Sequence, residues 1–279
     1  MNNADQIEYW NGSAGLTWAR MQARMDIALT PVTAALLSTA APQQGENILD
    51  IGCGSGETTL ALAAAVGEGG SVLGLDISEP LLERARARAA ELLSEADFLV
   101  ADAATFNDEA GFDLLVSRFG IMFFADPVAA FANLHALAAP TGRLCFACWQ
   151  APAQNLWATL PGQAVAALLP PAAPADPLAP GPFAFADPER VRTILTAAGW
   201  HDIDFQPHAF TMVIGEGDDP IASAVHFTLR IGPAAKSVRE AGPDIEIAAR
   251  AALAAALAPH AAADHLGLPA AVWLVTAHV

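Results

Sequence analysis

Three glycines stand at alternate positions directly after a short apolar run: Gly52, Gly54 and Gly56 follow Asn47–Ile51. Glycine is needed where the backbone turns sharply, or where a ligand approaches closer than a Cβ atom permits. A helix is predicted to begin directly after the third glycine. Its free N–H groups and partial positive charge add binding capacity to the turn. This order of strand, glycine turn and helix indicates a small-molecule binding site.

The glycine spacing and a preceding acid restrict the ligand. A dinucleotide-binding G-x-G-x-x-G turn that starts at Gly52 would require a third glycine where Glu57 stands. Asp50 lies just before the turn, where its carboxylate would repel a pyrophosphate but attract an ammonium group. S-adenosylmethionine carries an ammonium group on its amino-acid end. The turn therefore favours this cofactor over a dinucleotide.

Three further polar residues follow the next apolar runs. Asp76 ends the run that begins at Val72, and an acid there can accept hydrogen bonds from both hydroxyls of a ribose. Asp102 follows the third run, where its carboxylate can accept the adenine amino group, and Ser117 ends the fourth. The carboxyl ends of parallel strands meet at one edge of a sheet. We therefore expect these residues and the glycine turn to face one crevice.

The elements that must position these residues alternate between short apolar runs and helical stretches, which predicts βαβ units and a parallel sheet. The predicted strands are Asn47–Ile51, Ser71–Leu75, Asp97–Ala101, Phe112–Ser117, Gly142–Trp149, Ile203–Ile214 and Ala271–Ala277. The main predicted helices are Glu57–Val66, Pro80–Leu93, Pro127–Ala138, a helix from Pro188 through Ala198, and Pro243–Leu257. The predicted fold class is α/β: a Rossmann-like, seven-stranded, mostly parallel sheet with helices on both faces.

We divide the chain into an N-terminal helical cap, residues 1–45, and a Rossmann-like domain, residues 46–279. Two excursions leave the sheet pattern, at about 151–182 and 220–257. Prolines in the first prevent any long regular element except a helix near Asn155–Leu169. Segments at this edge of the sheet can close over a ligand, so we expect both excursions to act as lids.

The charge balance restricts the partner. The formal net charge is −17, from 30 acidic and 13 basic residues, and Lys236 is the only lysine. Nucleic acids are held through Lys and Arg contacts to phosphates. We therefore expect a small-molecule partner and no nucleic acid.

No uninterrupted apolar stretch reaches the roughly 18–20 residues that cross a bilayer, and the first residues lack the pattern of a signal peptide. We expect no membrane span and a cytoplasmic protein. Cys145 and Cys148 form a C-x-x-C pair without a second Cys/His pair, so we expect buried structural thiols and no metal site. No sequence pattern predicts an oligomeric state.

The motifs occur in a recognisable order: D-x-G-C-G-S-G at 50–56, L-D at 75–76, A-D-A at 101–103, F-D-x-x-x-S-R-F-G-x-M-F-F at 112–124 and P-T-G-R at 140–143. In this order they resemble the class I S-adenosylmethionine-dependent methyltransferases. They are most similar to the ubiquinone/menaquinone C-methyltransferase-like group of small-molecule enzymes. The resemblance covers about Tyr9–Trp149 and is weaker in the C-terminal half. The family usually has a paired glycine in the turn where this chain has Ala139-Pro140-Thr141-Gly142, a departure with little effect on cofactor binding.

The resemblance implies roles in binding S-adenosylmethionine. Gly52 and Gly54 would let the backbone approach the methionine part, and Asp50 would help to hold its ammonium group. Asp76 would bind the ribose, and Ile77 would pack on the adenine.

The same resemblance assigns the remaining cofactor contacts. Asp102 together with Ala103 would meet the amino edge of the adenine. Ser117 would lie near the methyl-bearing sulfur. Trp10 and Trp18 would close the pocket, as N-terminal aromatic residues often do in this family.

The expected reaction is methyl transfer to a small, apolar or aromatic molecule, because the segments that can roof the crevice are rich in apolar side chains. These side chains are Trp10, Phe119, Met122, Phe123, Trp157, Phe183 and Phe227. Displacement at a carbon activated by a sulfonium requires orientation more than chemistry. A general base is needed only if the acceptor loses a proton. His208 and His226, in the lid-forming region, are the candidates, and catalysis without a base is the alternative.

Two other functions are compatible with a Rossmann-like fold. One is an NAD(P)-dependent oxidoreductase, which the glycine spacing disfavours and for which Tyr9 and Lys236 form no recognisable catalytic pair. The other is a protein that binds S-adenosylmethionine without transferring its methyl group.

Overall fold

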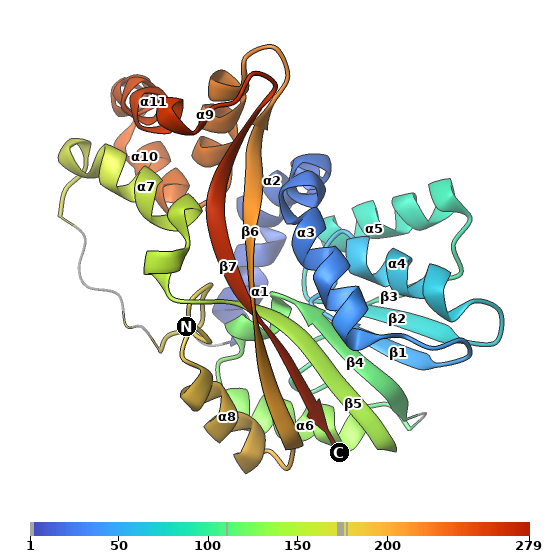
Figure 1. The fold of residues 1–279 in the computed structure, drawn as a ribbon. Coiled ribbons are helices and arrows are strands. Elements are labelled where there is room, and N and C mark those ends of the chain that lie inside the picture. Colours follow the sequence, from blue (N-terminus) through green and yellow to red (C-terminus); the bar gives the residue numbers. More distant parts are fainter. Residues whose placement is uncertain (1–2, 110, 172–175, 177) are drawn as a thin grey trace.

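A computed structural model describes residues 3–109, 111–171, 176 and 178–279. Seven strands form one sheet in the order β3-β2-β1-β4-β5-β7-β6 (Figure 1). Within this part of the chain the strands are β1 (Asn47–Ile51), β2 (Ser71–Asp76), β3 (Asp97–Val100), β4 (Phe112–Arg118), β5 (Ala138–Trp149), β6 (His201–Glu216) and β7 (His265–His278). Only β7 runs against its neighbours β5 and β6. The predicted mostly parallel, seven-stranded α/β sheet is confirmed.

The order of the strands determines where a ligand can bind. β1 pairs with β2 on one side and with β4 on the other, and both pairings are parallel. From β1 the chain proceeds through β2 to β3 at one edge of the sheet. It then crosses back, and β4 forms on the other side of β1. In open α/β sheets this switch point opens a crevice beyond the carboxyl ends of the strands. The glycine turn follows β1 and lies at this point.

Helices cover both faces of the sheet. In the first half of the chain these helices are α3 (Gln22–Ala40), α4 (Glu57–Val66), α5 (Glu79–Leu92) and α6 (Pro127–Leu137). In the second half, α8 (Pro188–Ala197) lies beside α6. Neighbouring residues of a strand point to opposite faces. Phe146 of β5 packs against Phe131 of α6, whereas Cys145 lines a hollow together with the end of α3. α3 and α6 therefore lie on opposite faces.

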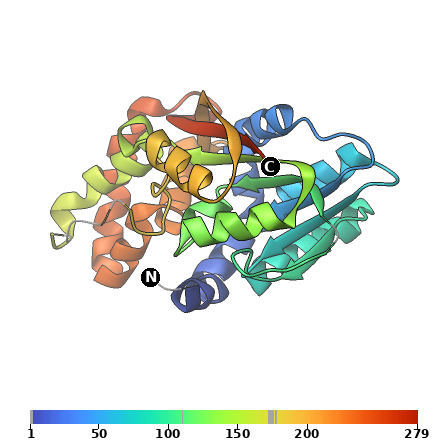
Figure 2. The same cartoon turned by 90° about the horizontal axis from the view of Figure 1, so that it is seen from below.

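The two excursions fold as helices that pack on each other. The first contains α7 (Leu156–Val165), and the second contains α9 (Pro220–Arg230), α10 (Pro233–Ala241) and α11 (Pro243–Leu257). These four helices gather beside the far ends of β6 and β7, at the upper left of Figure 1. Seen from below, this helical cluster and the β3 edge lie at opposite ends of the molecule (Figure 2). Residues 172–175 and 177 of the first excursion lie outside the described residues.

The first residues form α1 (Asn3–Asn11) and α2 (Ser13–Arg20), which precede α3. α3 packs directly on β4, β5, β6 and β7, and the boundary at residue 45 stays a prediction. Short 3-10 helices complete the chain as described: η1 (Gly120–Phe123), η2 (Pro152–Gln154), η3 (Ala166–Leu168) and η4 (Ala258–His260). None of the helices in the described ranges is both long and apolar enough to cross a bilayer.

Candidate active site

A cavity of about 720 Å³ opens at the carboxyl ends of the central strands. Its lining comes from the glycine turn after β1, the ends of β2 and β4, the N-terminal helices, and the helical cluster of α7, α9 and α10. All the predicted cofactor residues except Ser117 are among its lining residues: Trp10, Trp18, Asp50, Gly52, Gly54, Asp76, Ile77, Asp102 and Ala103. One cavity thus collects residues from distant parts of the sequence.

Gly52 and Gly54 of the turn differ in what surrounds them. Gly52 and Gly54 both adopt the left-handed conformation, with φ of 65° and 55°. A Cβ atom on Gly52 would lie 2.6 Å from the Cα of Gly120, whereas a Cβ on Gly54 would meet nothing within 4 Å. Gly52 therefore satisfies a backbone contact as well as lining the cavity. Gly54 leaves open space where a ligand can approach the backbone.

Asp50 is buried at the end of β1, with 1% of its surface exposed. The hydroxyl of Thr59 in α4 donates to its carboxylate at 2.7 Å. Burial raises the pKa of Asp50 to about 6, although the hydrogen bond from Thr59 and the charge of Arg118 act in the opposite direction. A carboxylate held in this way gains from a cationic ligand, because a nearby positive charge offsets the loss of its hydration.

Asp76 ends β2 and supports the glycine turn. One carboxylate oxygen accepts from the backbone N–H of Gly54 at 2.8 Å, and the other accepts from the N–H of Ser78 at 2.9 Å. Burial raises the pKa of Asp76, while these backbone hydrogen bonds lower it. Each carboxylate oxygen has a second lone pair, so the group can still accept hydrogen bonds from a ligand in the cavity.

The N-terminal helices are fastened to the loop after β2. Asn11 donates to the carbonyl of Ile77 at 2.7 Å and accepts from the N–H of Glu79 at 3.0 Å. Ser78 donates to the carbonyl of Trp10 at 2.6 Å. These bonds hold the aromatic side chains of α1 over the part of the cavity that Ile77 lines.

The aromatic residues of this region pack edge to face. The ring of Trp10 lies 5.5 Å from that of Trp18 and 5.7 Å from that of Phe123. All three line the cavity. They form an apolar cover between the N-terminal helices and the loop after β4.

Asp102 and Ala103 follow β3 and line the same cavity. The carboxylate of Asp102 accepts from the N–H of Ala104 at 3.0 Å, which fixes the turn. The carbonyl of Ala103 accepts from Asn133 of α6 at 3.0 Å. The loop is therefore tied to the helix that follows β4, and its acid is held at the cavity edge.

Ser117, predicted to lie near the methyl-bearing sulfur, stands where the end of β1 meets the loop after β4. It is fully buried and is absent from the lining of the cavity. Its hydroxyl donates to the carbonyl of Ile51 at 2.7 Å and accepts from the N–H of Gly120 at 3.2 Å. Ser117 joins the end of β1 to the loop after β4, and this structure gives no support for a contact with a methyl-bearing sulfur.

The two candidate bases, His208 and His226, are also absent from the lining of the cavity. His208 is on β6, stacked near Phe210, and its buried Nε2 has no hydrogen-bond partner among the described residues. His226 is exposed on α9. Burial and the charges of Arg230, Arg250 and Arg24 lower the pKa of His226. Neither histidine lines the cavity, so the geometry gives no support for either as a base.

A half-buried network of charged side chains joins the helices around the turn. Arg88 of α5 pairs with Asp26 of α3 at 2.9 Å and with Glu57 of α4 at 2.7 Å. Burial and the neighbouring Glu57 raise the pKa of Asp26 to about 6. Arg88 thus ties three helices together, and one of its partners, Glu57, stands where a dinucleotide-binding turn would have its third glycine. In the sequence, the only sign of this network is an acid, Asp26, within an apolar helical face.

An aromatic wall extends the cavity toward the helical cluster. The rings of Phe119 and Trp149 are stacked 4.4 Å apart with a 6° angle between their planes. Trp157 of α7 lies 4.7 Å from Trp149, and Phe183 stacks 5.9 Å from Trp157. Phe119 has a φ of 71°, a strained conformation for a non-glycine residue that is common at binding sites. This wall offers a flat apolar surface to a ligand.

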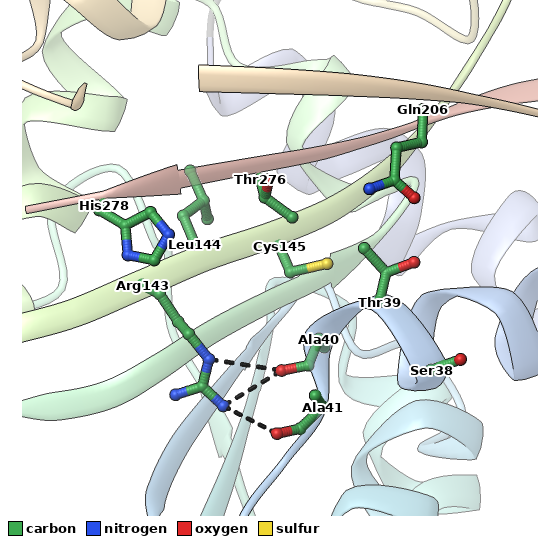
Figure 3. A pocket seen from close by; sticks show the side chains of 10 residues that line it. All are labelled: Ser38, Thr39, Ala40, Ala41, Arg143, Leu144, Cys145, Gln206, Thr276 and His278. Carbon is green, nitrogen blue, oxygen red and sulfur yellow. Dashed lines mark hydrogen bonds between the residues drawn. The ribbon is translucent and has the colours of Figure 1, made fainter. Parts of the chain in front are cut away.

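A second hollow, of about 520 Å³, lies beside the end of α3 (Figure 3). Arg143 within it donates to the carbonyl oxygens of Ala40 and Ala41 and pairs with Glu46 at 2.6 Å. Its arginine is therefore already occupied by the protein. None of the motif residues assigned to cofactor binding lines this hollow.

Comparisons with known proteins agree with this geometry. Residues 48–142 match a family model described as a methyltransferase domain. Aklanonic acid methyltransferase from Streptomyces sp. strain C5 is 36% identical over 119 residues, which are 42% of this chain and 54% of that protein. Demethylmenaquinone methyltransferase from Staphylococcus epidermidis is 34% identical over 108 residues, which are 38% and 44% of the two chains. The chain thus spans about half the length of these relatives.

The fold extends further than the sequence similarity. The crystal structure of the YcgJ protein from Bacillus subtilis superposes with a TM-score of 0.56 at 16% identity, over 88% of this chain and 97% of that one. At this identity the likeness concerns the fold alone. The family match covers β1 to the start of β5, which is the part that carries the glycine turn, Asp76 and Asp102. Over residues 48–142 the chain is therefore similar to the methyltransferase-domain family, and this match supports the resemblance to the class I, S-adenosylmethionine-dependent methyltransferases.

Proposed function

We propose that this protein transfers a methyl group from S-adenosylmethionine to a small, apolar or aromatic molecule. The observation that carries the proposal is the single cavity that joins the glycine turn with the aromatic wall. Cofactor and acceptor must meet in one enclosed space for a direct transfer, and this cavity has a distinct surface for each.

The residues of the turn fit the cofactor. The open space at Gly54 admits a ligand to the backbone. The buried Asp50 and Asp76 give that end of the cavity a negative charge, which suits the ammonium and sulfonium groups. When bound, S-adenosylmethionine would supply an activated methyl group.

The protein's own contribution is orientation and the exclusion of water. Asp50 and Asp76 would fix one reactant at the turn, while Phe119 and Trp149 would align a flat acceptor against it. Trp10, whose ring packs against neighbouring aromatic rings, would keep water from the reacting atoms. Alignment of two reactants can contribute roughly 7–11 kcal/mol to lowering a barrier. Because no histidine lines the cavity within the described residues, we propose that no histidine acts as the base.

The relatives support a small acceptor. Their names give aklanonic acid, nocamycin and demethylmenaquinone as the molecules with which these proteins are associated. A small-molecule acceptor also suits a protein with a net charge of −17, which would repel nucleic acid. A cytoplasmic location, expected from the sequence, is part of the proposal.

Titration calorimetry with S-adenosylmethionine and with NADH tests the cofactor. We expect saturable binding of S-adenosylmethionine and none of NADH; the reverse result would favour the oxidoreductase alternative. Incubation with methyl-labelled cofactor and a cell extract then tests transfer. Label that appears in a small molecule supports the enzyme, whereas binding without any transfer would identify a non-catalytic cofactor-binding protein.

A further inference from the structure

Basic side chains from the helical cluster line the cavity: Arg230 comes from the end of α9, and Lys236 and Arg239 come from α10. In Figure 1, α9 and α10 lie across β6 and β7 from β1, the strand that leads into the glycine turn. The whole chain has only 13 lysines and arginines against 30 acids, and Lys236 is the only lysine. Three of these scarce cations, all from α9 and α10, therefore line one cavity. We call Arg230, Lys236 and Arg239 the basic rim.

The chain break between two helices builds the basic rim. α9 ends at Arg230, Gly232 follows with a φ of 123°, and α10 begins at Pro233. Lys236 and Arg239 are three residues apart on α10, a spacing that places two side chains on the same helix face. The break turns α10 so that this face joins Arg230 at the cavity.

The basic rim is weakly compensated by the protein. Elsewhere arginines are closely paired, as Arg88 is with Glu57 at 2.7 Å and Arg143 with Glu46 at 2.6 Å. Lys236 has a single, long contact of 3.9 Å to Glu240, with both side chains about two-thirds exposed. Such exposed ion pairs contribute little to the free energy of folding. The ion pairs found within the described ranges include neither Arg230 nor Arg239.

Opposite charges line the cavity on different elements. The region of the glycine turn contributes one arginine, Arg118, and five acids: Asp26, Asp50, Glu57, Asp76 and Asp102. The basic rim comes from α9 and α10, and the aromatic wall also lines the cavity. A ligand that fills the acceptor part would meet stacked rings together with positive charge.

We infer that the basic rim binds a carboxylate on the methyl acceptor, so that the substrate class is an aromatic acid. This inference rests on the proposed function, because it concerns the acceptor part of the same cavity. The rim would anchor one end of the acceptor while its ring lies on Phe119 and Trp149. It would also attract an anion toward a protein whose net charge otherwise repels anions.

Calorimetry in the presence of saturating S-adenosylhomocysteine tests the inference with a matched pair of probes, naphthoate and naphthamide. They share the ring and differ in the charge of one group. We expect naphthoate to bind at least about tenfold more tightly than naphthamide, since hydrogen bonds to charged groups are stronger than those to neutral ones. The difference should shrink as salt is raised.

Variants assign the effect to the basic rim. Arg230→Gln, Lys236→Gln and Arg239→Gln should each weaken naphthoate binding several-fold and leave binding of S-adenosylhomocysteine unchanged. Arg250→Gln is the matched control. It removes the same charge from an arginine of α11 that pairs with Glu246 and does not line the cavity. This control should bind naphthoate like the parent.

The sole lysine offers a second measurement. Reductive methylation with a carbon-13 label places one side-chain NMR probe, at Lys236. Its signal should shift on addition of naphthoate and stay in place with naphthamide. If the parent protein does not bind S-adenosylhomocysteine, the proposed function itself is refuted. With that binding intact, equal affinity for the two probes, no naphthoate binding at millimolar concentration, or rim variants that bind like the parent would each overturn the aromatic-acid inference alone.

Discussion

Gly52 and Gly120 pack backbone against backbone where the loops after β1 and β4 meet. A Cβ on Gly120 would lie 2.5 Å from the carbonyl oxygen of Ile51 and 2.8 Å from the Cα of Gly52. The hydroxyl of Ser117 closes the contact by bonding to both loops. Both glycines line the cavity, so this backbone contact forms part of its wall.

The first prediction separates the two glycines. Gly52→Ala should destabilise the fold by about 2–4 kcal/mol, because it adds a steric conflict to an unfavourable φ. Gly54→Ala should cost only the conformational strain, about 1–2 kcal/mol, but should weaken binding of S-adenosylmethionine at least about tenfold. Chemical denaturation and calorimetry measure the two effects.

Gly45→Ala is the control for these variants. Gly45 also has a positive φ, of 83°, and a Cβ atom there would meet nothing within 4 Å. It does not line the cavity. The control should therefore show the strain without the loss of binding. A folded Gly54→Ala protein with unchanged cofactor affinity would remove the turn from the binding site.

β1 to β4 and β6 could be located from the sequence to within two residues at each end. The first four are short apolar runs bounded by glycine, proline or polar residues. β5 and β7 begin four and six residues earlier than predicted. β7 begins at His265, six residues before the predicted start, and includes Gly267 and Pro269. Pro269 pairs with Thr211 of β6 beyond the point where β5 stops pairing, so the strand tolerates its missing N–H there. The local sequence does not show that a proline will lie where only one neighbouring strand pairs.

The site shows the same division. The acids that follow strands were found because a strand end determines their position, as for Asp76. Ser117 follows the same rule, yet its side chain faces the loop of Gly120 and not the cavity. The basic rim was missed because Arg230, Lys236 and Arg239 resemble solvated helix residues until the break at Gly232 is seen in three dimensions.

The second prediction concerns Asp76. Asp76→Asn keeps the shape of the side chain but removes its charge and one of the two acceptors that bind the N–H groups of Gly54 and Ser78. We expect cofactor affinity to fall about tenfold or more, and more than in Asp102→Asn, the matched control in the same cavity. Calorimetry at one pH compares them. An Asp76→Asn protein that binds as tightly as the parent would show that the ribose assignment is wrong.

The third prediction follows from the raised pKa of Asp50, about 6 in the folded protein. Ionised Asp50 attracts the ammonium group, and protonated Asp50 does not. Affinity for S-adenosylmethionine should therefore be highest above pH 7 and should decrease as the pH falls through 6. Calorimetry between pH 5 and 8 measures the profile, and Asp50→Asn should bind weakly with a flatter profile. A parent profile that is as flat as that of Asp50→Asn would contradict the role of Asp50.

The fourth prediction links the same carboxyl to stability. Since the pKa of Asp50 is higher in the folded than in the unfolded chain, the folded state binds its proton more tightly. The resulting stabilisation is present at low pH and is lost as the pH rises through about 6. Asp50→Asn removes the cost of the buried charge, so the free protein should be more stable than the parent at pH 7.5, by up to about 3 kcal/mol. Denaturation at pH 4.5 and 7.5 checks this, and an advantage that is larger at the lower pH would refute it.

The last prediction concerns motion of the two excursions. α7, α9 and α10 contribute to the same cavity as the glycine turn, so ligands that fill it would join the helical cluster to the sheet. Segments that close over a substrate are generally less stable when the site is empty. We expect amide hydrogen exchange in 156–165 and 220–241 to be faster than in β1 and β4 of the free protein. It should slow markedly with S-adenosylhomocysteine and naphthoate together, and less with S-adenosylhomocysteine alone. Exchange at α8, on a face outside the cavity, should not change. If α7, α9 and α10 are already as protected as the central strands in the free protein, they are fixed walls of the cavity and not lids.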